Sequence, residues 1–328
     1  MRRGSLKRAL ITGISGQDGS YLAELLLENG YEVLGLVRDS QGPLHENLRR
    51  IQGKVRLVEG SLLSQESLIA LLDAYRPQEV YNLAARASSK TLFSEPVLTG
   101  EVNGLAVVRI LEAIRVVGSY IRFFQASSSE VYGRSAQSPQ TELTPFGPRN
   151  PYGVAKLFAQ GMVATYREHY GIFACCGILF NHESPRRPRE FVTRKITSAA
   201  AKIKAEGAGT LELGNLDATR DWGYAPDYVR GMWLMLQREV PEDFVLATGE
   251  SHSVREFCET AFGRLGLDYR QHVVSKADSK RPVESVPLVG DATKAKCLLS
   301  WRPTVRFEEL VEIMVDADLE LVNRGVTQ

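Results

Sequence analysis

The amino-acid sequence predicts an α/β fold, a doubly wound parallel sheet followed by a smaller C-terminal domain. Three observations support this class. Strand-like apolar runs alternate with helical patterns as far as Phe180, a glycine-rich turn directly follows the first strand, and short arginine- and proline-containing motifs follow Phe180. Alternating strands and helices favour a parallel sheet with helices on both faces. We therefore expect a first domain over residues 1–180, with a returning segment near 217–248, and a substrate-binding domain over 181–328.

Composition and charge exclude several classes of protein. The 328-residue chain has a formal net charge of +1 and no long run of one sign, which argues against a nucleic-acid-binding surface. No apolar stretch approaches the ~20 residues of a membrane-spanning helix, and Met1-Arg2-Arg3 leads into a strand and a glycine turn rather than a signal peptide. The four cysteines lack metal-ligand spacing and suit free thiols in a reducing compartment. We expect a cytoplasmic protein without a metal site.

The first strand, residues 8–12, runs directly into a glycine-rich turn and a helical pattern that stops at Asn29-Gly30. A second strand covers residues 31–37. Glycines at i, i+3 and i+6 permit a tight turn, let a pyrophosphate approach the backbone and pack the helix on the sheet, while the helix N-terminus donates N–H groups. The unit predicts a Rossmann-type dinucleotide site whose cofactor-binding residues are Gly13, Gly16, Gln17, Asp18 and Gly19.

Residues at the end of the second strand distinguish the two nicotinamide dinucleotides. An acid there would bind the ribose 2′-hydroxyl of NAD, which is the role that Asp39 favours. Arg38 and Ser40 instead suit a 2′-phosphate, with Arg49 or Arg50 as helpers. The sequence predicts NADP as the cofactor, with NAD as the alternative.

Further elements alternate as the fold class requires. We expect strands over residues 55–58, 79–85, 121–125 and 173–180, and helices over 66–75, over 105–116, from Tyr152 and from about Phe191. The strand at 79–85 ends in small residues that would let a cofactor lie close. The motifs fall at the carboxyl edge of the predicted sheet, where open α/β sheets bind ligands.

Ser128 and Glu130 follow the strand at 121–125, and Tyr152 and Lys156 open the next helix. Residues four apart share a helix face. A free phenol, with a pKa of about 10, is a poor base at neutral pH, and a nearby ammonium would lower that pKa. These four residues predict a catalytic site with two bases and a hydroxyl donor. Alone, the Tyr-x-x-x-Lys spacing equally fits an amphipathic helix with a core Tyr and a solvated Lys.

Beyond Phe180 several arginines occur within short motifs, at residues 181–187, 220–223 and 281–284. In a nearly neutral chain they indicate a local anionic ligand such as a second diphosphate. Each arginine alone also suits a surface ion pair, and His182 also suits a hydrogen-bonded structural role.

With these stretches assembled, the chain resembles the extended short-chain dehydrogenase/reductases, and among them the GDP-mannose 4,6-dehydratases, from Thr12-Gly13 to Trp301-Arg302-Pro303. The glycine turn, Asn82-Leu83-Ala84-Ala85, Asn103 and the Tyr152/Lys156 pair are general to that superfamily. The motifs more specific to the dehydratases cover residues 16–22, 181–187, 191–195, 213–217, 220–223 and 232–236.

The resemblance implies conversion of GDP-mannose to GDP-4-keto-6-deoxymannose by internal redox elimination. Tyr152 would take the proton of the sugar 4-hydroxyl while C4 hydride passes to NADP⁺, and Glu130 would remove the C5 proton. Water would leave from C6, assisted by Ser128 or protonated Glu130, before hydride returns to C6.

The resemblance also implies binding residues and an assembly state. Besides the glycine turn, Arg38, Ser40, Tyr152 and Lys156, the implied cofactor contacts are Leu62, Leu83, Ala84, Ala85, His182 and Arg187. The implied contacts to the nucleotide sugar are Ser88, Asn181, Val192, Lys195, Leu213, Asn215, Arg220, Arg281 and Glu284. The family pattern also predicts a homodimer or homotetramer.

Departures from the family pattern keep alternatives open. Ser128 replaces a usual Thr, Ser61 a usual Asp and Asp39 a second Arg, and Arg86-Ala87-Ser88-Ser89 replaces a Gln-Ser-His type of segment. A guanidinium at position 86 favours a larger or more anionic sugar. Glu130 argues against a 4-keto-6-deoxyhexose reductase and an epimerase, which need no C5 base, but is compatible with a nucleotide-sugar decarboxylase. A non-catalytic cofactor-sensing protein would typically have lost the Tyr152/Lys156 pair.

Overall fold

The computed structural model describes residues 6–43, 45–87, 93–276 and 286–325. Three predicted substrate contacts, Ser88, Arg281 and Glu284, lie outside the described residues. Within these ranges no helix is both long and apolar enough to pass through a bilayer. The same ranges contain no group of three His, Cys, Asp or Glu side chains that could bind a metal ion.

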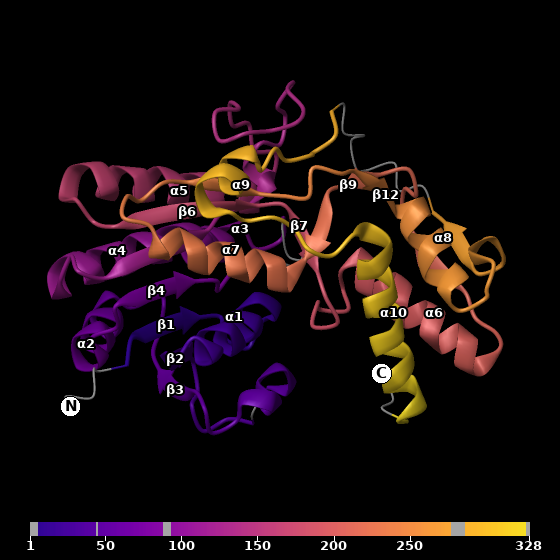
Figure 1. Cartoon of the computed structure of the whole chain (residues 1–328), viewed down its shortest axis with the longest axis horizontal. Coiled ribbons are helices and arrows are strands. Elements are labelled where there is room, and N and C mark those ends of the chain that lie inside the picture. The colour runs from indigo at the N-terminus through magenta and orange to yellow at the C-terminus, as the bar shows by residue number, and fades with distance from the viewer. Residues whose placement is uncertain (1–5, 44, 88–92, 277–285, 326–328) are drawn as a thin grey trace.

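A seven-stranded parallel sheet forms the centre of the molecule, in the order β11-β6-β5-β4-β1-β2-β3 (Figure 1). Its strands are β1 (Arg8–Thr12), β2 (Glu32–Val37), β3 (Arg56–Glu59), β4 (Glu79–Asn82), β5 (Arg122–Ala126), β6 (Ala174–Leu179) and β11 (Phe244–Leu246). The strand order reverses between β1 and β4, which is where such sheets open a ligand crevice. The predicted doubly wound parallel sheet is confirmed.

Helices cover both faces of this sheet. On one face lie α1 (Gln17–Glu28), α7 (Ala225–Gln237) and the short α9 (Thr293–Leu299), and on the other lie α2 (Gln65–Tyr75), α4 (Ala106–Val117) and α5 (Pro151–Tyr170). Side chains alternate along a strand, so Ala9 and Ile11 of β1 enter the core beneath α1 whereas Leu10 enters the core beneath α2 and α4. The strands are therefore apolar on both faces, as buried parallel strands must be.

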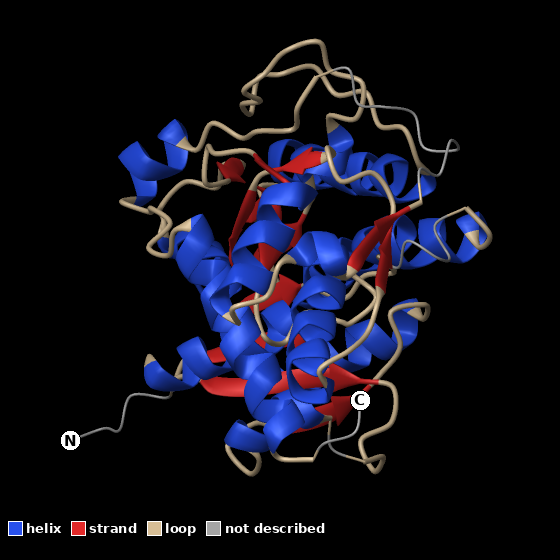
Figure 2. Cartoon of the chain, turned by 90° about the vertical axis from the view of Figure 1, so that its right-hand side faces the viewer, coloured by secondary structure: helices blue, strands red, loops and turns tan. Residues whose placement is uncertain are grey.

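A second hydrophobic cluster holds together α6 (Val192–Glu206), α8 (Val254–Arg264) and α10 (Phe307–Asn323), at the right of Figure 1. Trp222 lies in it, edge-on to Phe257 and stacked on Phe307. Figure 2 faces this end of the molecule, with helices in front of strands. β11 and α7 return from this part of the chain to the central sheet. Division into two domains near residue 180 stays a prediction.

Several short strands and helical segments complete the described fold. The short strands pair as β7 (Asn181–Glu183) with β10 (Trp222–Tyr224), β8 (Leu211–Leu213) with β13 (Val273–Ser275), and β9 (Thr219–Arg220) with β12 (His252–Ser253). The short helical segments are η1 (Glu46–Ile51), α3 (Pro96–Gly100), η2 (Glu101–Leu105), η3 (Ser129–Val131) and η4 (Tyr269–Gln271).

Several predicted boundaries differ from the structure by a residue or more, and two of these differences lie near the candidate site. The strand expected over 79–85 ends at Asn82. The N–H of Leu83 donates to both the carbonyl and the hydroxyl oxygen of Thr12 (3.3 and 3.1 Å), whereas the N–H of Ala84 donates to the Thr12 hydroxyl (3.1 Å). The helix expected from residue 105 begins one residue later and follows the π-helical segment η2. Within η2, Asn103 exchanges two hydrogen bonds with the backbone of Arg86. Such segments are frequent at functional sites.

Candidate active site

The glycine turn packs against the end of β4. Gly13 has a φ of +70°, and a Cβ built on it would lie 2.8 Å from the Cα of Ala84. A Cβ on Gly19 would lie 2.2 Å from the Gly13 carbonyl oxygen. Any larger residue would therefore displace the turn or the helix behind it. The structure brings Gly13, Leu83 and Ala84 together, with Ala85 exposed beyond them. This cradle, with the N-terminus of α1 behind it, fits a dinucleotide pyrophosphate.

The predicted 2′-phosphate residues lie at the end of β2. Arg38 is exposed, and the Ser40 hydroxyl donates to Glu59 (3.3 Å). Asp39 is engaged locally, because its Oδ1 accepts the N–H groups of Gln41 and Gly42 (2.9 and 3.1 Å). The segment η1, which carries the exposed Arg49 and Arg50, is tied to the glycine turn by Asn47, whose amide donates to the Ser15 carbonyl oxygen (3.0 Å). Leu62, half-buried, packs against the helices of the opposite sheet face.

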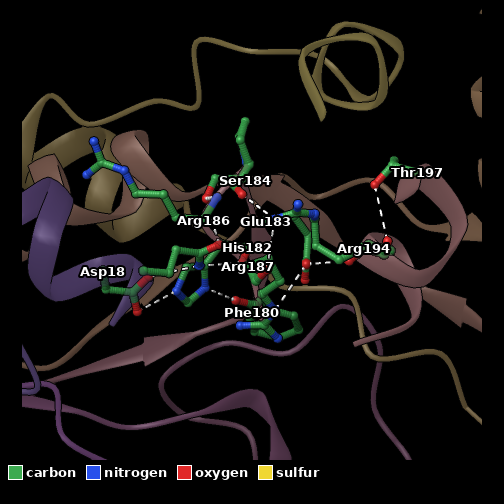
Figure 3. A network of polar contacts seen from close by, with 12 residues as sticks. Asp18, Phe180, His182, Glu183, Ser184, Arg186, Arg187, Arg194 and Thr197 are labelled. Atoms are coloured by element: carbon green, nitrogen blue, oxygen red, sulfur yellow. Dashed lines mark hydrogen bonds and ion pairs between the residues drawn. The ribbon is translucent and has the colours of Figure 1, made fainter. Parts of the chain in front are cut away.

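Asp18 and His182, both predicted cofactor contacts, form a partly buried ion pair (Figure 3). His182 Nε2 lies 2.9 Å from the Asp18 carboxylate and Nδ1 lies 2.7 Å from the Phe180 carbonyl oxygen. A carbonyl and an ionised carboxylate can only accept, so both ring nitrogens carry protons. Burial lowers the pKa of His182, but the charge and hydrogen bond of Asp18 outweigh it and raise that pKa overall. The imidazole ring also stacks on the ring of Tyr228, with 4.6 Å between their centroids. His182 therefore has a structural role whether or not it also contacts a cofactor.

Two arginines of residues 181–195, Arg186 and Arg194, form ion pairs with acidic side chains of other helices. Arg186 donates to Ser20 (3.0 Å) and pairs with Glu24 (2.6 Å), which fastens this region to α1. Arg194 is buried and forms an ion pair with Asp318 of α10. These two guanidinium groups are used within the protein, so they contribute to its internal structure rather than offering free sites to an anion.

Arg187 lies differently. Its guanidinium pairs with buried Glu183 (3.1 Å) and sits 3.7 Å from the centroid of the Phe191 ring (Figure 3). Its charge also acts on Asp18, His182 and Tyr152, because it shifts the pKa of each. Of the two adjacent arginines, Arg187 is thus the one whose charge acts on Asp18, His182 and Tyr152, whereas Arg186 is paired with α1.

The four predicted catalytic residues come together at the carboxyl edge. Ser128 caps η3 by accepting the N–H of Glu130 (3.3 Å), and its side chain acts to lower the pKa of Tyr152. The Glu130 carboxylate accepts a hydrogen bond from the Asn150 amide (2.7 Å). Lys156 is buried, with its Nζ 5.5 Å from the Tyr152 ring centroid. The site therefore combines a hydroxyl, a carboxylate, a phenol and an ammonium.

The expected lowering of the Tyr152 pKa is contradicted, because the pKa lies above that of a free phenol. Burial raises the pKa of Tyr152 to about 12, and the hydrogen bond with Ser128 offsets this only in part. The Lys156 ammonium instead donates to the Ala126 carbonyl oxygen (2.7 Å). Desolvation of the phenolate thus outweighs the effects of Ser128 and of the Arg187 charge, which act in the opposite direction.

The lowered pKa of Lys156 leads us to expect that kcat and the free energy of unfolding change with pH in opposite directions. Burial lowers its pKa from 10.5 to about 8, so its charge is lost as the pH rises through 8. On the hypothesis that this charge assists ionisation of Tyr152 during turnover, we expect kcat to fall above pH 8. Stability should change in the opposite sense: between about 8 and 10.5 the unfolded chain binds more protons than the folded one, so the free energy of unfolding rises with pH. Paired kcat and urea-unfolding measurements across this window test both signs, and a flat kcat would contradict the role of the Lys156 charge.

The residues predicted to hold the nucleotide lie on several elements at the junction of the two clusters. Asn181 is half-buried in β7, Val192 and Lys195 lie in the first turn of α6, and α6 contacts β8, which ends at buried Leu213. Asn215 is exposed and accepts the Asp217 N–H (2.9 Å), while Arg220 faces His252 in the β9–β12 pair.

Sequence reasoning missed three residues of this site. Asn150 caps α5 and binds Glu130, Gly153 provides close packing behind Glu130, and buried Glu183 holds both Arg187 and Thr193 (2.6 Å). The capping role of Asn150 could have been predicted from the sequence, since Asn is favoured at the N-cap of a helix and Pro at the first helical position that follows it. Glu183 stands within the family motif at residues 181–187, but no role was predicted for it.

Solved structures with this fold include nucleotide-sugar enzymes. UDP-glucose 4-epimerase of Thermotoga maritima, solved with UDP-glucose, has a TM-score of 0.85 at 26% identity and covers 98% of this chain and all of its own. The Thermus thermophilus enzyme, solved with NAD, has a TM-score of 0.82 at 26% identity over the same shares. With the Tyr152/Lys156 pair and the glycine turn in place, fold and site define an extended short-chain dehydrogenase/reductase.

Sequence relatives narrow this class. The family described as GDP-mannose 4,6 dehydratase matches residues 10–314. GDP-mannose 4,6 dehydratase 1 of Arabidopsis thaliana is 49% identical, covering 97% of this chain and 91% of the relative, and the Homo sapiens enzyme is 48% identical, covering 96% and 92%. The chain belongs to the GDP-mannose 4,6-dehydratase family.

Proposed function

We propose that the protein is a nucleotide-sugar 4,6-dehydratase that converts GDP-mannose to GDP-4-keto-6-deoxymannose. The observation that carries this proposal is Glu130, a carboxylate held beside the Ser128/Tyr152/Lys156 group. Oxidation of an alcohol needs one base, whereas elimination next to the new ketone needs a second. A reductase or an epimerase on this scaffold has no use for that second base.

The chain's own residues account for the proton transfers. Tyr152 accepts the proton of the 4-hydroxyl, with its phenolate stabilised by Ser128 and the Lys156 charge. Glu130 removes the C5 proton, which the 4-ketone acidifies, and then returns it to the departing C6 hydroxyl as water leaves. Ser128 provides a further hydroxyl donor to that leaving group. C5 takes up a proton from solvent when hydride adds to C6, which balances the 4-hydroxyl proton that Tyr152 releases to solvent. The bound nicotinamide supplies hydride acceptance at C4 and hydride donation at C6, so no cofactor is consumed.

The direct test is to incubate the purified protein with GDP-mannose and a catalytic amount of NADP⁺. We expect a 4-keto sugar, detected by its alkaline absorbance, with no net change in cofactor oxidation state. Net consumption of NADPH would mean a reductase, and loss of carbon dioxide from a uronic-acid substrate would mean a decarboxylase. Absence of turnover with any nucleotide sugar would favour the cofactor-sensing alternative.

Arg86 bears on the choice of sugar. Its guanidinium forms an ion pair with Glu95, so its charge is matched within the chain. This pairing supports a neutral hexose over the larger or more anionic sugar that the isolated arginine suggested. A binding screen of GDP-, UDP-, CDP- and dTDP-sugars tests both the base and the hexose.

NADP is the proposed form of the nicotinamide cofactor. Its support is the exposed Arg38 at the end of β2, the arginines of η1 beside the turn, and the engagement of Asp39 by its own backbone turn. Arg38→Ala should weaken NADP binding about 10–100-fold, the effect of losing one charge-assisted pair worth roughly 1.5–3 kcal/mol. NAD affinity should stay unchanged. Titration by fluorescence measures both, and equal losses for the two cofactors would contradict 2′-phosphate recognition.

We also propose a homodimer or homotetramer in a cytoplasmic compartment. Val154 and Phe158 of α5 are exposed, as are Leu98 of α3 and Leu105 at the end of η2, and α5 contacts both of these segments. Apolar side chains gathered in this way favour contact with a second copy. Sedimentation equilibrium distinguishes dimer from tetramer.

The cytoplasmic location is supported by the cysteines. All four are free, which suits a reducing compartment.

A further inference from the structure

Asn150 connects the two halves of the candidate catalytic site. It is the N-cap of α5, where its Oδ1 accepts the N–H of Gly153 (2.8 Å). Its amide nitrogen, Nδ2, donates to Oε2 of Glu130 (2.7 Å). One short side chain therefore holds both the helix that carries Tyr152 and Lys156 and the carboxylate proposed as second base.

The orientation of this amide follows from its partners. A backbone N–H can only donate, and an ionised carboxylate can only accept. Turning the amide over would set two donors against each other at Gly153 and two acceptors against each other at Glu130. The arrangement with Oδ1 toward Gly153 and Nδ2 toward Glu130 satisfies both partners at once.

The backbone around Glu130 is also fixed. Its N–H is bound by Ser128, and a Cβ on Gly153 would lie 2.6 Å from the Glu130 carbonyl oxygen. The first turn of α5 thus packs directly on the backbone of η3. With the backbone held on both sides, the Asn150 amide sets the direction of the carboxylate itself. Among the described residues, it leaves the second oxygen, Oε1, without a hydrogen-bond partner and so free to take a proton.

We propose that Asn150 is a positioning residue for the elimination step, which aims the Glu130 carboxylate at the sugar C5 while capping the catalytic helix. The inference rests on the proposed function. Pre-organised bases gain rate because the reacting groups already lie in the attacking geometry. Loss of the amide donor should therefore slow C5 proton removal, yet leave C4 oxidation by Tyr152 intact.

Two variants separate the capping role from the positioning role. Asn150→Ser keeps a side-chain acceptor that can cap Gly153 but has no amide to reach Glu130. Asn150→Ala loses both contacts. We expect Asn150→Ser to retain the melting temperature and GDP-mannose affinity of the wild type, whereas Asn150→Ala should melt at a lower temperature.

The decisive measurement is the kinetic isotope effect with GDP-mannose deuterated at C5, together with the amount of oxidised, uneliminated 4-keto sugar. In Asn150→Ser we expect turnover to fall roughly 10–100-fold, the C5 isotope effect to increase and the oxidised sugar to accumulate. An unchanged turnover and isotope effect would overturn the inference. So would equal slowing of oxidation and elimination, which indicates a general disturbance of α5. The wild-type arm tests the proposed function independently.

Discussion

Tyr152→Phe is expected to abolish C4 oxidation, with kcat reduced roughly 10²–10⁴-fold, the usual contribution of a positioned acid–base group. The ring stays in place, so the packing beneath it is retained and only the hydroxyl that contacts Ser128 is lost. Affinity for GDP-mannose and for the cofactor should be nearly unchanged. Stopped-flow absorbance of the cofactor and NMR of the sugar should show no oxidised product.

A matched control removes a different phenol from the same helix. Tyr166 donates its hydroxyl to Glu112 (2.7 Å), away from the catalytic turn. Tyr166→Phe should keep full kcat. Should Tyr152→Phe turn over at the wild-type rate, another group takes the 4-hydroxyl proton, and the assignment of Tyr152 is wrong.

Glu130→Gln should block the reaction one step later. The amide keeps the size of the side chain and can still accept the Asn150 hydrogen bond through its oxygen, but it cannot act as a base. We expect C4 oxidation to proceed and elimination to fall roughly 10²–10⁴-fold. The 4-keto sugar with its 6-hydroxyl retained should accumulate beside reduced cofactor, and deuterium from heavy water should not enter C5.

Comparison of the two variants orders the steps. Tyr152→Phe should yield no oxidised sugar, whereas Glu130→Gln should yield oxidised sugar without loss of water. Glu168→Gln, an exposed carboxylate near the other end of α5, serves as the charge-matched control and should behave as wild type. Normal product from Glu130→Gln at a normal rate would remove the role assigned to Glu130 and, with it, the main argument against a reductase or epimerase.

Local sequence patterns determined much of the fold. The strand at Arg8–Thr12 is confirmed because an apolar run bounded by a glycine turn has few alternatives. The residues that line the carboxyl edge were predictable for the same reason, since parallel strands end at a common edge. The family was also accessible from the sequence, because its long motifs at 16–22 and 181–187 occur nearly unbroken.

Other features depend on which side chain meets which across the chain. Arg186 and Arg187 are adjacent and chemically identical, yet one pairs with Glu24 of α1 and the other with Glu183 beneath the site. Glu183 is four residues from Arg187, but Glu24 cannot be assigned to Arg186 by spacing, since residues 24 and 186 meet only when α1 packs beside this segment. The same holds for Arg86. Its sequence context suggested an anionic sugar as its partner, whereas in the structure its guanidinium pairs with Glu95.

The sequence by itself determined the class of protein, the order of strands and helices, and the four groups able to perform the chemistry, because these follow from local periodicity and residue type. Tertiary structure alone decided the protonation of those groups. The spacing of Tyr152 and Lys156 suggested an activated phenol, but burial makes the phenol harder to ionise and the lysine easier to discharge. Desolvation is a property of the assembled surroundings, and it acts on a side chain only once the chain has folded around it.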